Sequence, residues 1–158
     1  MSHTQRYRLI SGNFRYMTYP KQLPNNWKYR LLEDIYVLTG ITPLMPSYSS
    51  EFMSINRLGV LHMKAGYSWD GASGHCPDHE AIMYPSCVHD GLCQLFTLGI
   101  ITKAQRYAAD ALLGTMVRAE MYRLSERWGS IKKAAHRTWA EAWSRMVWFC
   151  VRSYSVIT

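Results

Sequence analysis

Two patterns of hydrophobic and polar positions divide the chain near residue 70. In the first part, β-favouring residues form short runs between turn signals. These runs occupy residues 6–12, 28–40 and 52–69. Such runs predict strands, and the last one predicts a hairpin that turns near Asn56 to Gly59. Proline-punctuated segments at 19–26 and 40–50 predict loops, so we expect a small antiparallel sheet in residues 1–70.

The second part of the chain has helical periodicity. Residues 71–84 form a polar, Gly-containing loop, and three helices are expected after it. They are predicted over 85–97, from a Thr102 cap to about 126, and from about 130 to 154. The third helix carries an apolar stripe that predicts a core or interface face, made of Trp139, Trp143, Val147, Cys150 and Tyr154. The expected fold is α+β in one domain over residues 1–158, mainly β over 1–70 and mainly α over 85–158.

The charge of the chain is uneven. Its net charge is +7, and residues 103–152 hold ten Lys or Arg against four Asp or Glu. This basic helical half suits anionic lipid, nucleic acid or an acidic protein, although a solvated helix face is the simpler and favoured explanation. No run of about 18 apolar residues predicts a transmembrane helix, and the N-terminus lacks the apolar stretch of a signal peptide. We expect a soluble protein made in the cytoplasm, with reduced cysteines.

Two ionisable residues, His89 and Asp90, interrupt the apolar face of the first predicted helix. The link "LGIT" that follows this helix is short, which favours an antiparallel helical hairpin. His89 lies ten and a half positions before the midpoint of that link, and Asp110 lies the same distance after it. Residues at equal distances from the turn of an antiparallel pair lie at the same height. The spacing therefore predicts that His89 and Asp110 face one another.

A carboxylate bonded to one imidazole nitrogen fixes the tautomer and leaves the other nitrogen as a base toward solvent. His89 would then be the base and Asp110 its orienting partner, while Asp90, about 100° away on the helix, would bind a cation or a backbone amide. The alternative is a buried, hydrogen-bonded pair with a structural role. The preceding loop, with Tyr67, Asp70, Gly71 and Ser73, can turn oxygens toward a cation or amides toward an anion.

Taken together, "AGYSWDGAS", "VHDGLC" and "RYAAD" resemble an uncharacterised protein family of tailed phages and prophages. Its pattern is Gly-aromatic-x-x-Asp-x-Ala-Ser, then His-Asp-x-Leu-Tyr, then Arg-x-x-Ala-Asp. The matching residues are Gly66, Tyr67, Asp70, Ala72, Ser73, His89, Asp90, Leu92, Arg106, Ala109 and Asp110. One departure is Cys93, which stands where the family has Tyr. A hydrogen-bond network through that hydroxyl is expected to be lost.

The same residues also resemble the helix-hairpin His–Asp site of phospholipase A2. That resemblance implies His89 as the base that activates water, Asp110 as its orienter, and Asp90 as a calcium ligand together with the loop around Asp70. The chain departs from that family in its loop glycines, in Cys93 and in the absence of a disulfide framework.

Two further sites are alternatives. His75, Cys76 and His79, with Cys87, are donors that zinc accepts, although no paired Cys-x-x-Cys motif accompanies them. Ser73 is a candidate nucleophile for a Ser–His–Asp arrangement, although it lacks a nucleophile elbow.

The phage resemblance implies a virion component, associated with the tail or capsid, or a small accessory factor. Such a protein would be made in the host cytoplasm, be incorporated in the virion, and bind other virion proteins or a host protein. The first alternative is a metal-dependent ester or lipid hydrolase, with calcium favoured over zinc. The second is an inhibitor of a host protein.

Overall fold

The computed structural model describes residues 8–20, 26–72, 78–126 and 130–157, with strands first and helices after them. This arrangement confirms the α+β prediction. The strands are β1 (Arg8–Ser11), β2 (Tyr16–Thr18), β3 (Tyr29–Leu31), β4 (Ile35–Leu38), β5 (Ser47–Ser49), β6 (Met53–Asn56), β7 (Val60–Met63) and β8 (Ser68–Trp69). The helices are α1 (Glu80–Thr97), α2 (Lys103–Ser125) and α3 (Ser130–Ile157).

The strands form two antiparallel sheets. The larger has the order β1-β4-β7-β6-β5, and the smaller has the order β2-β3-β8. The hairpin predicted near residues 56–59 is confirmed: the Asn56 side chain accepts hydrogen bonds from the backbone N–H groups of Leu58 and Val60. Strand β5 falls in a segment that was predicted to be a loop. It is a short edge strand with half-exposed and exposed residues, so it carries no hydrophobic alternation that would predict it.

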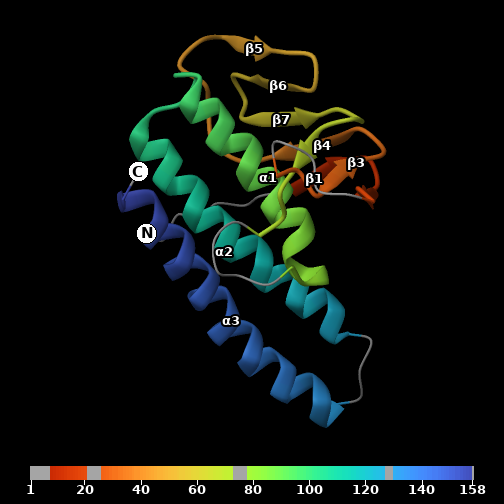
Figure 1. Ribbon diagram of the computed structural model, residues 1–158. Coiled ribbons are helices and arrows are strands. Elements are labelled where there is room, and N and C mark those ends of the chain that lie inside the picture. The colour runs from red at the N-terminus through yellow and green to blue at the C-terminus, as the bar shows by residue number, and fades with distance from the viewer. Residues whose placement is uncertain (1–7, 21–25, 73–77, 127–129, 158) are drawn as a thin grey trace.

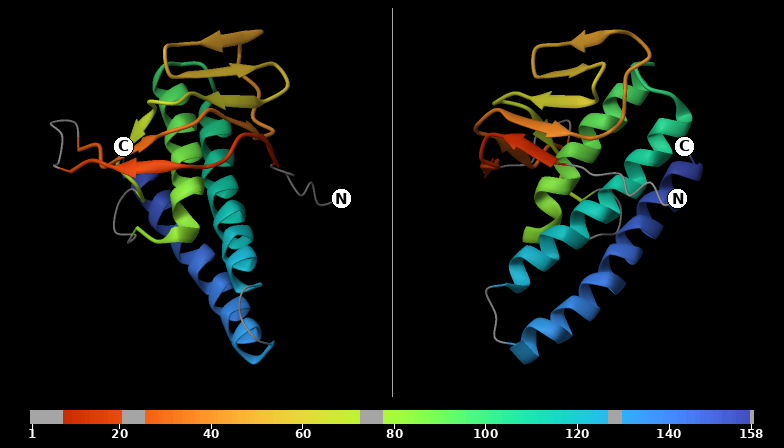
Figure 2. Two further views of the ribbon diagram at one scale, coloured as in Figure 1. Left: turned by 90° about the vertical axis from the view of Figure 1, so that its right-hand side faces the viewer. Right: turned by 180° about the vertical axis from the view of Figure 1, so that it is seen from behind.

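Helix α1 lies between the larger sheet and α2, and α3 packs on α2 from outside (Figures 1 and 2). Strands β4, β6 and β7 alternate buried and less buried residues, and their buried side chains face α1. Gly91 marks the close approach, because a Cβ there would lie 3.1 Å from Met63 Cε and 3.3 Å from Met53 Sδ. The helix that carries His89 is therefore held against the sheet on one side and α2 on the other.

The predicted start of the first helix, residue 85, is wrong. Helix α1 begins at Glu80, and His79 caps it by accepting a hydrogen bond from Ala81 N through Nδ1 at 3.1 Å. Pro85 therefore lies inside the helix, where it removes one backbone hydrogen bond. The first turn is kept because its apolar residues, from Ala81 onward, are buried in the core.

The second helix has the predicted Thr102 cap, as a full capping box with Gln105. On α3, Val147 is fully buried and Trp143 is half-buried, as the apolar stripe predicts, but Trp139 is 43% exposed. The side chain of Tyr154 lies outside the described residues. No helix within the described part of the chain is both long and apolar enough to cross a membrane.

We expect Gly91→Val to lower the free energy of unfolding by about 2 kcal/mol, because its added carbons would overpack α1 against the sheet methionines. Urea unfolding followed by circular dichroism measures this change. Gly114→Ala is the matched control on α2. Its Cβ would lie 3.4 Å from Trp148 Cβ, so better helix propensity should stabilise the protein by about 0.5–1 kcal/mol. Equal effects of the two substitutions would contradict the close approach at Gly91.

Candidate functional site

A cleft of about 1030 Å³ opens between the second half of α1, the start of α2 and the strand residues around β8. Small-molecule sites have volumes of roughly 300–1000 Å³, so this cleft has the size of a ligand site. It contains polar residues from all three regions, namely Asp70, His89, Asp90, Cys93, Lys103 and Arg106.

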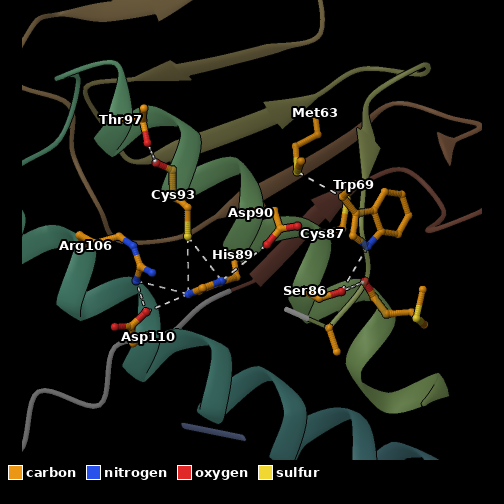
Figure 3. A network of polar contacts seen from close by, with 12 residues as sticks. Met63, Trp69, Ser86, Cys87, His89, Asp90, Cys93, Thr97, Arg106 and Asp110 are labelled. Atoms are coloured by element: carbon orange, nitrogen blue, oxygen red, sulfur yellow. Dashed lines mark hydrogen bonds and ion pairs between the residues drawn. The ribbon is translucent and has the colours of Figure 1, made fainter. Parts of the chain in front are cut away.

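His89 and Asp110 meet across the α1–α2 hairpin. His89 Nε2 lies 2.8 Å from Asp110 Oδ1, and the two side chains are 5% and 0% exposed. The register counted from the link is therefore confirmed. Figure 3 shows the imidazole of His89 between Asp110 on one side and the α1 residues Asp90 and Cys93 on the other.

Arg106 is a second cationic side chain that contacts Asp110. One turn before it on α2, Arg106 donates a hydrogen bond from a terminal guanidinium nitrogen to the same oxygen that His89 contacts (Figure 3). Arg106 belongs to the matched motif, but no role was predicted for it. Its spacing of four residues from Asp110 was the available signal, since such pairs share a helix face.

Asp110 and His89 both favour their charged forms. Burial opposes ionisation of Asp110, but the hydrogen bonds from His89 and Arg106 outweigh it and hold the pKa of this carboxyl below its usual value. Burial also opposes a charge on His89. The adjacent Cys93 and the hydrogen bonds to two carboxylates outweigh that effect and raise the pKa of His89 well above its usual value. Both shifts favour the charged forms, an imidazolium and a carboxylate.

The sequence predicts that the second imidazole nitrogen, Nδ1, points toward solvent. In the structure it does not face open solvent. Cys93 Sγ lies 3.5 Å from His89 Nδ1 and 3.7 Å from Nε2. Position 93 therefore contacts the polar network through a thiol, without the hydroxyl of the family Tyr. Residues four apart on a helix are neighbours, so the spacing of His89 and Cys93 was the signal for this contact.

Asp90 turns toward Asp70 rather than toward a backbone amide. Its Oδ1 lies 3.8 Å from His89 Nδ1, and its carboxyl is hydrogen-bonded to that of Asp70. Burial raises the pKa of Asp90 to about 6, Asp70 adds to the rise, and His89 opposes it.

The predicted metal ligands Asp70 and Asp90 are thus brought together. Among the described residues, no group of three or more His, Cys, Asp and Glu side chains is placed to hold a metal ion. Calcium binds about six to eight oxygens, so these two carboxylates would supply only part of a calcium site. Their role as ligands stays a prediction.

Of the predicted loop residues Tyr67, Gly71 and Ser73, the structure describes the first two. Tyr67 is buried and lines the cleft beside Asp70. Gly71 has φ +91°, and a Cβ there would overlap the Asp78 carboxylate, which accepts hydrogen bonds from Tyr29 and from Ala72 N. Ser73 lies outside the described residues.

The alternative zinc ligands are also largely beyond what the structure describes. His75 and Cys76 lie outside the described residues. His79 is the α1 cap, and its ring lies 6.2 Å from that of Trp139. Cys87 is a buried free cysteine, and Cys93 and Cys150 are half-buried free cysteines.

Comparison with known proteins found no matching family model, no matching curated protein and no matching solved structure.

Asp90→Asn should change how stability depends on pH. Because the pKa of Asp90 is higher in the folded protein than in the unfolded chain, folded protein holds this proton more tightly, and wild-type stability should fall as pH rises from about 4 through 6. The variant cannot ionise there. Its stability relative to wild type should therefore rise by about 2–3 kcal/mol between pH 4 and pH 7. Urea unfolding at a series of pH values measures this.

Asp34→Asn is the control with the opposite sign. The backbone N–H of Ala65 and the His62 side chain hold the pKa of Asp34 below its usual value. The wild-type carboxylate therefore stabilises the protein above its unfolded pKa, and the deficit of the variant should shrink as pH falls below 4. A stability difference between Asp90→Asn and wild type that is constant from pH 4 to pH 8 would contradict a raised pKa for the buried Asp90.

Proposed function

We propose that this protein is an acyl hydrolase, acting on carboxylic esters or thioesters, in which His89 transfers protons. The observation that carries the proposal is the 2.8 Å contact between His89 Nε2 and the buried Asp110, in the wall of a cleft of about 1030 Å³. Imidazole is the side chain that most often performs proton transfer in catalysis.

Asp110 and Arg106 act as positioning residues in this proposal. Asp110 accepts the Nε2 proton of His89 and Arg106 neutralises the carboxylate, so the ring is held in one orientation. The Nδ1 side of the ring is then the side available to a reacting group in the cleft. A base whose tautomer and direction are set in advance loses little freedom when it reacts.

The lining of the cleft suits an acyl compound that carries an apolar part and a negative charge. Aromatic side chains line it from several elements, namely Trp27, Phe52, Tyr67, Phe96 and Tyr107. Arg30 and Lys103 line the same cleft and add positive charge. Aromatic surface binds the apolar part of a ligand, and the cations bind a carboxylate or phosphate group.

The other expected functions stay predictions. The motif resemblance supports a phage virion component or accessory factor, and the basic residues of α2 and α3 support an inhibitor that binds a host protein. Mass spectrometry of purified virions tests the first, and pull-down from a host lysate tests the second. Neither outcome decides whether the cleft hydrolyses esters.

We expect His89→Asn to lower kcat/KM for p-nitrophenyl acetate by at least about 100-fold, because proton transfer by a positioned side chain contributes at least this much. Release of nitrophenol measures the rate, and thermal melting checks that the variant folds. His62→Asn is the matched control. His62 also lies 2.8 Å from an aspartate, Asp34, but it does not line the cleft. Equal losses in the two variants, or full activity of His89→Asn, would refute the proposal.

Chelation separates proton transfer from metal dependence. The His89 dependence of hydrolysis should persist when EDTA is added to the same assay, because the proposed proton transfer uses only side chains of the chain. Loss of activity in EDTA, with recovery on addition of calcium, would instead support the cation role predicted for Asp70 and Asp90.

A further inference from the structure

The geometry points to Cys93 as the nucleophile of this site, with His89 as its acid and base and Asp110 as the positioning residue. The inference deepens the proposed function and rests on it. It assigns a catalytic residue and a covalent thioester intermediate, in place of the direct attack of water that the phospholipase A2 resemblance implies.

The thiol lies against the imidazole. Cys93 Sγ is 3.5 Å from Nδ1 and 3.7 Å from Nε2, and Figure 3 shows both contacts. Nε2 is also bonded to Asp110 at 2.8 Å. The site therefore brings together the three kinds of side chain that nucleophilic catalysis uses: a nucleophile, a base, and a group that orients the base.

Among the described cysteines, Cys93 is the one that lines the cleft. It is half-buried. Cys87 is 0% exposed, and its sulfur lies 4.0 Å from Met63 Sδ. A thiol buried in such apolar surroundings is inert. Cys150 is half-buried on α3 and has no described contact with a histidine or with the cleft. It is therefore an internal reference for ordinary thiol reactivity.

A guanidinium lies near Cys93 in the cleft. Arg106 lines the cleft with a guanidinium nitrogen 3.4 Å from His89 Nε2, and the Cys93 sulfur lies 3.7 Å from the same ring nitrogen. Adjacent positive charge stabilises a thiolate, which is the nucleophilic form.

The proposed reaction needs only Cys93, His89, the ester and water. The Cys93 thiolate attacks the carbonyl carbon of an ester, a C–S bond forms, and the C–O bond to the leaving alkoxide breaks. The proton on His89 passes to that alkoxide, which leaves as an alcohol. Water then gives a proton to His89 and adds to the thioester carbonyl, the C–S bond breaks, and the acid leaves. The thiolate and the imidazolium are restored.

Alkylation of the intact protein tests the activated thiol without any substrate. With limiting iodoacetamide at pH 7, peptide mapping should find Cys93 modified at least about 10-fold faster than Cys150, because a thiolate reacts and a thiol does not. His89→Asn should remove this difference and leave the rate at Cys150 unchanged. Modification of Cys93 no faster than Cys150 in the wild-type protein would overturn the inference.

A trapped acyl group tests the intermediate. Acid quenching during turnover of p-nitrophenyl acetate should give protein carrying one acetyl group, mapped to Cys93. Cys93→Ser, checked by thermal melting, should lose both adduct and hydrolysis, whereas Cys150→Ser should keep both. Hydrolysis that needs His89 but persists in Cys93→Ser would overturn the inference and leave the proposed function standing. Fast, His89-dependent alkylation with no hydrolysis at all would refute the proposed function and support the Cys93–His89 pair.

Discussion

The site depends on one buried charge, the carboxylate of Asp110. It is completely shielded from solvent within the helical layer, where an unpaired charge costs several kcal/mol. His89 from α1 and Arg106 from α2 both contact its Oδ1 and supply the compensation. Loss of either cation would weaken this compensation. Because His89 and Asp110 lie on different helices, their contact defines the height at which α1 and α2 meet.

The chemistry of the cleft follows from that constraint. Because Asp110 occupies one imidazole nitrogen, the other faces Asp90 and Cys93 across the α1 surface. The ring is 95% buried by the same packing, which removes water as a competitor for its hydrogen bonds. The polar groups of α1 are tolerated because its opposite face packs closely on the sheet through Gly91 and many apolar side chains.

Local signals predicted much of the helical half. Thr102 and Gln105 form the expected capping box, and the count from the α1–α2 link located the partner of His89. Local signals also misled at the start of α1, where Pro85 is a typical first-turn residue but lies inside a longer helix. The burial of apolar residues before Pro85 stabilises that extra turn, and burial depends on what packs against a segment. Strand β5 escaped prediction for a related reason, because an edge strand is defined by its neighbour β6.

The sequence by itself determined the order of the elements, the α+β class and the register of His89 against Asp110, because these follow from periodicity, caps and the length of one link. Tertiary structure decided what the site contains. The approach of the β8 region to α1 places Asp70 against Asp90, and the direction of the His89 ring places Nδ1 beside Cys93 and Asp90 rather than in open solvent. The contact between Asp70 and Asp90 joins segments whose separation depends on packing across the whole core, and spacing along a single helix or hairpin carries no information about it.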